Sequence, residues 1–239
     1  RYTVVDGIPE LKQAVCRKFK SENNLDYQPS EITVSSGCKQ LLFNALMATL
    51  NRGDEVIIPA PYWVSYSAMV EIADGRPIII PCAAEQQFKL TPDKLESAVT
   101  PATRWLILNS PSNPTGAVYT EDEIQQIIDL AVRHDLFLIA DEVYREFIYQ
   151  GSAVRSLLSY DDIADRVIVV DSLSKRYSLC GGRIGCLVSK NRQVTAASLK
   201  FAQARLSPPT LGQLAGAGAS SLGETYFDEI RDEYRKRRD

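Results

Sequence analysis

Seven short apolar runs alternate with helical patterns along this chain, and the alternation restricts its fold more than any other feature. The runs occupy residues 31–36, 54–60, 76–82, 105–110, 136–142, 166–172 and 183–189. Continuous apolar strands joined by helices are typical of a parallel sheet that is buried on both faces. The sequence therefore predicts an α/β fold, with three α/β/α layers around a mostly parallel seven-stranded sheet.

Local signals indicate where several helices begin. Thr120 and Glu123 have the spacing of a capping box, which predicts a helix over residues 120–135. Thr91 is expected to be an N-cap because Pro92 suits the first helical position. Two further helices are expected over residues 37–50 and 62–73.

Charge and hydropathy narrow the classes of function. The 239 residues include 27 Lys and Arg against 30 Asp and Glu, so the net charge of -3 provides no overall basic field for a nucleic-acid backbone. No apolar run is long enough to span a bilayer. We therefore expect neither nucleic-acid binding nor a membrane location. The chain begins at Arg1 and ends in a charged helical pattern, and we expect it to be a fragment of a longer protein.

The cysteines and the single histidine lack the spacing of a metal site. There are five cysteines, Cys16, Cys38, Cys82, Cys180 and Cys186, and the one histidine, His134, has no neighbouring ligand set. Reduced thiols in a cytoplasmic protein are the simplest interpretation, with no bound metal.

Reactive residue types follow several of the predicted strands. Asn113 lies in the segment SPSNPTG, Asp141 and Tyr144 lie in ADEVY, and Lys175 lies in SLSKRYSLCGGRIG. Taken singly, each has an ordinary explanation: a turn, a helix cap, or a solvated basic loop with turn glycines. Together they lie just past the carboxyl ends of candidate parallel strands, which is the edge where open α/β sheets bind ligands.

This set of side chains matches the needs of one cofactor. Pyridoxal 5'-phosphate requires an amine that forms a Schiff base, a carboxylate facing its ring nitrogen and a cationic seat for its phosphate. The chain also resembles the large domain of the fold type I, class I aminotransferases, and is similar to bacterial aspartate aminotransferases of the Iγ type. The resemblance rests on six motifs in the family's order: RYTVVDGIPELKQA, VSSGCKQ, APYWVSY, SPSNPTG, ADEVY and SLSKRYSLCGGRIG.

The resemblance implies roles for the residues around the cofactor ring. Lys175 would form the Schiff base and then move a proton between the substrate Cα and the cofactor. Asp141 would pair with the ring nitrogen, while Tyr144 and Asn113 would hydrogen-bond the ring's phenolate oxygen. Trp63 would stack on the ring, although a tryptophan of the core or of an interface is the competing interpretation.

The phosphate seat has a physical rationale of its own. The helix expected from residue 37 would point the free N–H groups of Gly37, Cys38 and Lys39 outward, where its dipole favours an anion. The resemblance adds three residues to this seat: Ser172, Ser174 and Arg183. The family often has Gly or Ala at the position of Cys38, which a backbone contact tolerates.

Substrate and partner contacts also follow from the resemblance. Lys39, Asn113 and Trp63 would contact substrate, with Lys39 near the distal carboxylate of an acidic amino acid; an exposed helix lysine is the alternative. Tyr2 would reach the cofactor phosphate of the other subunit, which implies a homodimer with shared active sites. Arg205 is a weaker candidate for a residue near the partner's substrate pocket.

The resemblance implies a domain plan and a reaction. Residues 1–220 would form the cofactor-binding large domain without its N-terminal arm, and 221–239 would begin the helix toward an absent small domain that holds the α-carboxylate arginine. The expected reaction is a ping-pong amino transfer between aspartate, or another dicarboxylic donor, and 2-oxoglutarate. Alternatives are an aromatic or prephenate aminotransferase, a C–S β-lyase, and the ligand-sensing domain of a transcription regulator. A nucleotide-binding α/β module is a further alternative, but such modules have a G-x-G-x-x-G motif after the first strand, and SSGCKQ lacks that spacing.

Overall fold

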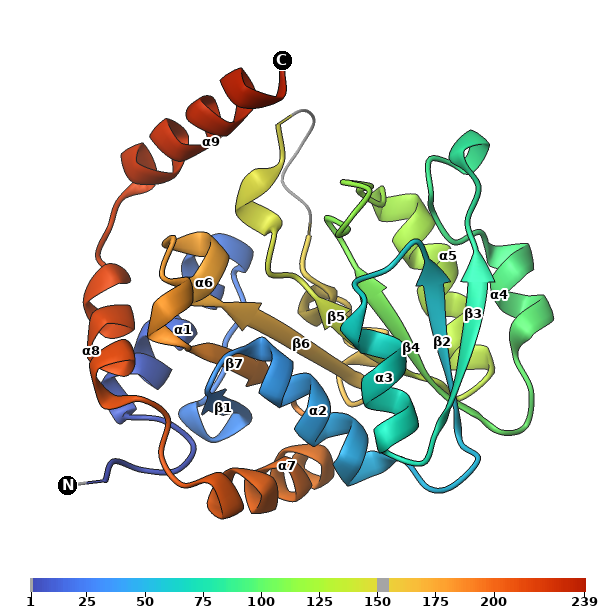
Figure 1. The fold of residues 1–239 in the computed structure, drawn as a ribbon, viewed down its shortest axis with the longest axis horizontal. Helices are drawn as coiled ribbons and strands as arrows, with labels where there is room; N and C mark the ends of the chain where they lie inside the picture. Colours follow the sequence, from blue (N-terminus) through green and yellow to red (C-terminus); the bar gives the residue numbers. More distant parts are fainter. Residues whose placement is uncertain (1, 150–154) are drawn as a thin grey trace.

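A seven-stranded sheet forms the centre of the molecule (Figure 1). The structure is a computed structural model that describes residues 2–149 and 155–239. The strands are β1 (Ile32–Ser35), β2 (Glu55–Ala60), β3 (Arg76–Pro81), β4 (Thr103–Asn109), β5 (Phe137–Asp141), β6 (Val167–Ser172) and β7 (Gly185–Val188). Their order across the sheet is β1-β7-β6-β5-β4-β2-β3. The predicted α/β fold and all seven predicted strands are confirmed.

One strand opposes the direction of the others. β7 pairs antiparallel with both β6 and β1, whereas the pairs β5·β6, β4·β5, β2·β4 and β2·β3 are parallel. The carboxyl ends of β4, β5 and β6 therefore meet at one edge of the sheet. Asn109 of β4 lies opposite Asp141 of β5 in the register, so the loops after these two strands begin side by side.

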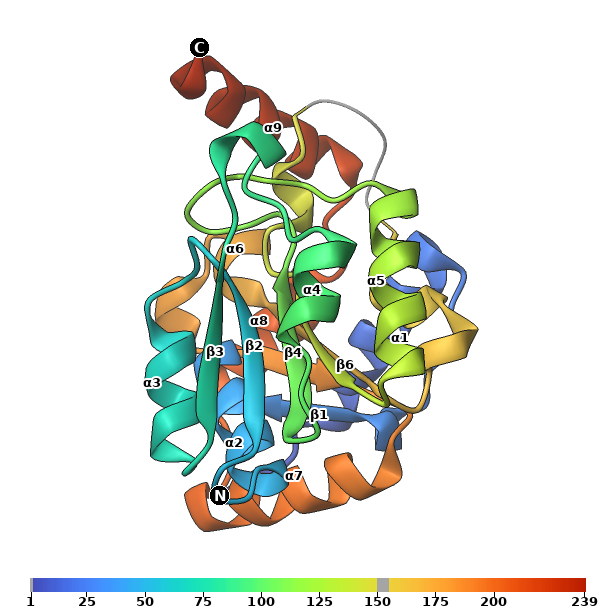
Figure 2. The same ribbon diagram turned by 90° about the vertical axis from the view of Figure 1, so that its right-hand side faces the viewer.

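Helices cover both faces of the sheet. They are α1 (Pro9–Asn23), α2 (Cys38–Thr49), α3 (Ser65–Ile72), α4 (Pro92–Ala98), α5 (Glu121–Arg133), α6 (Leu173–Arg176), α7 (Arg192–Arg205), α8 (Thr210–Ala219) and α9 (Glu224–Arg238). Figure 2 shows α3 on one side of the sheet and α1 and α5 on the other. Helix α9 extends along the upper rim in Figure 1, beyond these layers.

The core consists of two apolar layers that the sheet separates. Neighbouring residues of β2 point in opposite directions: Ile57 belongs to the layer with α1, α4 and α5, and Val56 belongs to the layer with α2, α3 and α7. β6 divides in the same way, with Val169 in the first layer and Val170 in the second. Burial on both faces explains why these strands are continuous apolar runs instead of alternating ones.

Helices α4 and α5 begin at the N-caps that the sequence predicted. Thr120 and Glu123 form the predicted capping box: the Glu123 N–H donates to Thr120 Oγ1 at 3.2 Å, and the Thr120 N–H donates to Glu123 Oε2 at 2.7 Å. Thr91 is the N-cap of α4, but within the described chain its side chain accepts no capping bond. Helices α1, α6, α7 and α8 were not among the sequence predictions.

Two further features concern cysteines and membranes. All five cysteines are free thiols. Within the described ranges, no group of three or more His, Cys, Asp or Glu side chains could hold a metal ion. The same part of the chain contains no helix with the length and hydropathy needed to cross a bilayer.

Candidate active site

A cavity of ≈ 330 Å³ opens at the carboxyl edge of β4, β5 and β6. Its volume is that of a small-molecule site. The structure brings most of the sequence-predicted residues to its wall: Cys38, Lys39, Trp63, Asn113, Asp141, Tyr144, Ser172, Ser174, Lys175 and Arg183. Tyr66, Asn109 and Cys180 also line the cavity and were not predicted.

Asp141 is a buried acid at the end of β5. Its side chain accepts a hydrogen bond from the Tyr66 hydroxyl at 2.7 Å, and its other oxygen has a long contact of 3.4 Å with the Val143 N–H. Within the described chain it forms no ion pair, so its charge is left to whatever enters the cavity. Burial raises the pKa of the carboxyl to about 6, against the opposing effect of the Tyr66 hydrogen bond. The next helical turn covers Arg145–Phe147 and has Tyr144 as its N-cap, so Asp141 is not a helix cap.

Asn109 joins the two loops that carry the reactive residues. Its side-chain amide donates to the backbone carbonyl of Asp141 at 2.9 Å, and its side-chain oxygen accepts the Asn113 N–H at 2.7 Å. The Asn113 side chain in turn lies 3.5 Å from the Tyr144 hydroxyl. The Lys175 amine lies 5.7 Å from the centroid of the Tyr144 ring. These contacts place Asn113, Tyr144 and Lys175 on one wall.

The start of α2 and the Arg183 guanidinium meet at one corner of the cavity. Gly37 is the N-cap of α2, with φ 91° and ψ 161°, a conformation essentially restricted to glycine. A Cβ at Gly37 would lie 2.6 Å from Arg183 Nη2, so a larger residue here would displace the end of the arginine side chain. Gly185 has a similar role, because its Cβ would lie 2.6 Å from the Cys38 N–H nitrogen. A helix N-terminus beside an arginine is a suitable seat for an anion.

Some of the residues near this corner already use their side chains in hydrogen bonds within the protein and are not available to bind an anion. The Ser172 hydroxyl accepts the Ser174 N–H at 3.0 Å and caps α6, so it is already engaged. The Cys38 thiol donates to the Asp171 carbonyl at 2.8 Å, and burial raises its pKa well above the ordinary value, so it stays a neutral thiol. Only the backbone of Cys38 is therefore suited to an anion.

Trp63 and Lys39 also line this cavity. The Lys39 amine lies 4.8 Å from the Trp63 ring centroid, a cation–π distance. The Trp63 ring packs edge-on against Tyr66, with centroids 5.4 Å apart. An aromatic ring and a lysine amine thus border the same cavity.

Comparison with known proteins places this arrangement in a family. The model of the family "aminotransferase class I and II" matches residues 1–239. The chain belongs to this family.

Relatives and solved structures of aminotransferases match along the whole chain. It is 42% identical to the aspartate/prephenate aminotransferase of Cereibacter sphaeroides, covering 100% of this chain and 60% of the relative. The crystal structure of the aspartate aminotransferase from Rhizobium meliloti superposes with a TM-score of 0.96 at 41% identity, covering 100% of this chain and 60% of that one. The crystal structure of the aromatic aminotransferase from Pyrococcus horikoshii superposes with a TM-score of 0.95 at 38% identity, covering 100% of this chain and 65% of that one. The chain thus spans about three fifths of the length of these relatives.

The cavity of this aminotransferase-family chain fits pyridoxal 5'-phosphate, the cofactor of the family. The buried Asp141 carboxylate, which no described residue pairs with in an ion pair, suits a protonated ring nitrogen. The glycine cradle at Gly37, closed by Arg183, suits a phosphate. Lys175 and Trp63 line the same cavity.

Three predicted residues lie away from the cavity wall. Gly37 stands behind Arg183 and shapes the corner without lining it. Tyr2 is 82% exposed on the surface. Arg205 is turned to its own chain, where it donates to Ser35 Oγ at 2.6 Å and to the Val5 carbonyl at 2.6 Å. This chain therefore uses the Arg205 guanidinium to join segments of its own fold.

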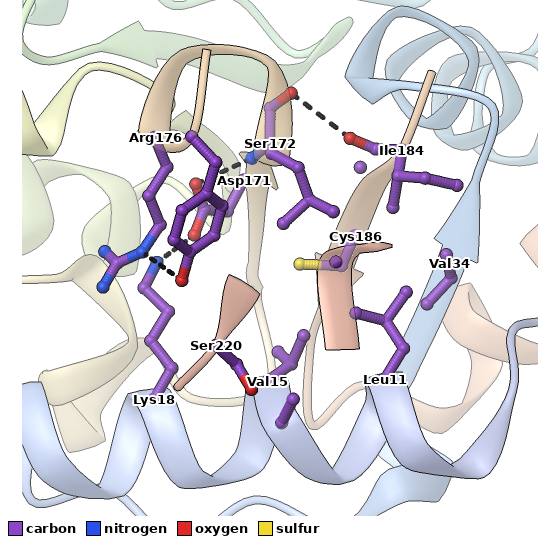
Figure 3. A pocket seen from close by; sticks show the side chains of 15 residues that line it. Leu11, Val15, Lys18, Val34, Asp171, Ser172, Arg176, Ile184, Cys186 and Ser220 are labelled. Carbon is purple, nitrogen blue, oxygen red and sulfur yellow. Dashed lines mark hydrogen bonds and ion pairs between the residues drawn. The ribbon is translucent and has the colours of Figure 1, made fainter. Parts of the chain in front are cut away.

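A second, smaller cavity of ≈ 40 Å³ lies between α1, α8 and the ends of β6 and β7. Figure 3 shows Lys18 rising from α1 toward Asp171 of β6, with which it forms an ion pair. Burial by itself would raise the pKa of Asp171, but the Lys18 charge holds it below its ordinary value. The two acids thus differ: Asp171 is paired with Lys18, whereas Asp141 lines the larger cavity and has no ion pair with any described residue.

Proposed function

We propose that the whole protein is a pyridoxal-phosphate-dependent aminotransferase that exchanges an amino group between a dicarboxylic amino acid and 2-oxoglutarate in a ping-pong reaction. The observation that carries this proposal is the placement of Lys175 and Asp141 on the wall of one cavity in a chain of the aminotransferase family. Aspartate is the favoured donor. Prephenate is a keto acid that could accept the amino group, since relatives at about 40% identity are named for aspartate and prephenate.

The cofactor would supply an electron-withdrawing ring that makes the substrate Cα–H acidic. Asp141 would accept the ring N–H and hold that nitrogen protonated. The Tyr144 hydroxyl and the Asn113 amide would donate to the ring's phenolate oxygen. Lys175 would link to the cofactor and, once released by substrate, carry the proton at Cα.

The remaining wall residues would bind and orient. Cys38 and Lys39 would offer backbone N–H groups to the phosphate, together with Ser174 and Arg183. The Gly37 N–H, which the sequence also suggested as a donor, is engaged by the Ser35 carbonyl at 2.8 Å, so Gly37 would only give the backbone its shape. Ser172 would keep the α6 turn in shape through its hydrogen bond to Ser174. The Trp63 ring would cover one face of the cofactor, and the Lys39 amine would attract the distal carboxylate of the substrate.

Two further parts of the proposal concern the assembly and its location. Exposed Tyr2 would reach the cofactor phosphate of a second subunit, so that a homodimer shares its active sites. The five free thiols suit a cytoplasmic protein. Mixing subunits that carry Tyr2→Ala with subunits that carry Lys175→Ala tests the sharing. Recovered activity in the mixture supports it, and none recovered contradicts it.

The main test is the attachment of the cofactor. The whole protein with pyridoxal 5'-phosphate should show a visible absorption band, and borohydride reduction should fix the pyridoxyl group on Lys175, as located by peptide mass spectrometry. Aspartate should bleach the band. Lys175→Ala should lack the band, and its persistence in that variant would overturn the assignment of Lys175.

A further inference from the structure

Tyr66 and Asp141 are joined by a hydrogen bond between residues 75 positions apart in the sequence. Tyr66 lies in the first turn of α3, and Asp141 ends β5. Both are buried, with 2% and 5% of their surface exposed. The hydroxyl donates to Oδ2 at 2.7 Å, while Oδ1 has only the 3.4 Å contact with the Val143 N–H. One carboxylate oxygen is thus held, and the other is left for a ligand.

The backbone of Asp141 is held separately. Asn109 donates to its carbonyl at 2.9 Å, and the β5 ladder pairs Asp141 with Asn109 on one side and Val170 on the other. The backbone position therefore does not depend on Tyr66. The Tyr66 hydrogen bond instead fixes the orientation of the carboxylate, which could otherwise rotate about its side-chain bonds.

The Tyr66 hydroxyl also favours the ionised form of Asp141, because its hydrogen bond lowers the pKa of the carboxyl. The charges of Asp171 in β6 and of the neighbouring Glu142 oppose the ionisation of Asp141, and the Cys38 thiol on the same cavity wall is neutral. The cations on the cavity wall are Lys39, Lys175 and Arg183, and within the described chain none of them forms an ion pair with Asp141. Burial raises the pKa of the Tyr66 hydroxyl well above its ordinary value, so it remains a donor at physiological pH.

On the basis of the proposed function, we propose that Tyr66 is a positioning residue that keeps the Asp141 carboxylate ionised and turned with one oxygen toward the cofactor's ring nitrogen. The sequence motif APYWVSY marks Trp63 as the residue near the cofactor and leaves Tyr66 without a role. The competing explanation is packing alone, since the Tyr66 ring also contacts Trp63.

Tyr66→Phe separates the two explanations because it keeps the ring and removes the donor. In the whole protein, the dissociation constant for pyridoxal 5'-phosphate should rise by about tenfold or more, the value of a hydrogen bond to a charged group. With cofactor labelled with ¹⁵N in the ring, the nitrogen resonance should move toward its unprotonated position. Without the hydroxyl the carboxylate is more basic, so the shared proton shifts toward Asp141.

Tyr119→Phe is the matched control. Tyr119 is a buried tyrosine whose hydroxyl accepts the Leu90 N–H at 2.8 Å, outside the cavity. It should lose a similar amount of stability while its cofactor affinity and ¹⁵N resonance stay as in the wild type. 3-Fluorotyrosine in place of Tyr66, a stronger donor of nearly equal size, should move the ¹⁵N resonance the opposite way from Tyr66→Phe.

The outcomes separate this inference from the proposed function. If the wild-type protein binds no pyridoxal 5'-phosphate through Lys175, the proposed function itself fails. If the wild type binds it and Tyr66→Phe changes neither affinity nor the ¹⁵N resonance, Tyr66 serves packing alone and the inference is overturned. Should Tyr66→Phe fail to fold, an unchanged resonance in the fluorotyrosine protein overturns it equally.

Discussion

Arg176 forms an ion pair with Glu22 of helix α1 and a second one with Glu146, in the turn after β5. Because Arg176 follows Lys175 in the chain, these pairs attach the lysine-bearing segment to two distant parts of the fold. The Arg176 guanidinium also lies 4.5 Å from the ring centroid of Phe227, at the start of α9. The contacts of the Arg176 side chain thus keep the neighbouring Lys175 at the cavity.

We predict that Arg176→Met lowers the free energy of unfolding by about 3 kcal/mol, since it breaks two part-buried ion pairs and leaves Glu22 only its 4.0 Å pair with Lys18. Arg237→Met, which removes an exposed pair with Glu233, should change it by less than about 1 kcal/mol. Urea denaturation of both variants of the whole protein measures the difference. Equal losses in the two variants would contradict a special role for the Arg176 pairs.

Asp141 destabilises the cofactor-free fold at neutral pH. Its folded pKa of about 6 lies above the ordinary 3.8, so the penalty is absent below pH 3.8, grows as the pH rises, and is complete above pH 6. In cofactor-free protein, Asp141→Asn should therefore be more stable than the wild type by up to about 3 kcal/mol at pH 8, and by little at pH 4. Denaturation curves between pH 4 and 8 measure this, and a gain independent of pH would refute it.

Asp171→Asn is the matched comparison for that experiment. This second strand-end acid is held ionised by Lys18, and its pKa lies below the ordinary value. Its contribution to stability is present at neutral pH and is lost as the pH falls through its folded pKa. The substitution should therefore destabilise the protein at pH 7, the opposite sign to Asp141→Asn.

Gly37→Ala should weaken phosphate binding at the corner where the start of α2 meets Arg183. The backbone conformation costs a residue with a Cβ about 1–3 kcal/mol, and the new methyl would displace Arg183. We expect weaker binding of pyridoxal 5'-phosphate and little change for pyridoxal, which lacks the phosphate. Gly53→Ala is the control, because Gly53 has φ 87° but open space around its Cβ. Equal losses of affinity for both ligands in Gly37→Ala would argue against a phosphate at this corner.

Lys39→Ala tests the choice of substrate. If the Lys39 amine pairs with a distal carboxylate, kcat/KM for aspartate should fall by about 10- to 100-fold, the value of a charge-assisted hydrogen bond. The value for alanine, which lacks that carboxylate, should change little and serves as the internal control. An equal fall for both amino acids would remove Lys39 from substrate recognition.

Several features of the site were predictable because they are local. The apolar runs before Asn113, Asp141 and Lys175 indicate buried strands, and reactive side chains just past parallel strands must share an edge. The Thr120 and Glu123 capping box is equally local. Tyr66 and Asn109 escaped prediction because their significance lies in hydrogen bonds to Asp141, and nothing in their own segments identifies that partner.

The sequence by itself determined the seven strands, the order of the motifs and the chemical types gathered at the carboxyl edge, because apolar patterning and turn residues act over a few neighbours. The tertiary structure alone decided which strand-end acid is paired and which is left open. Asp141 is the last residue of β5 and Asp171 the last but one of β6. Tyr66 of α3 packs against Asp141, whereas Lys18 of α1 packs against Asp171. A charge takes its properties from the groups packed around it, and only folding brings those groups together.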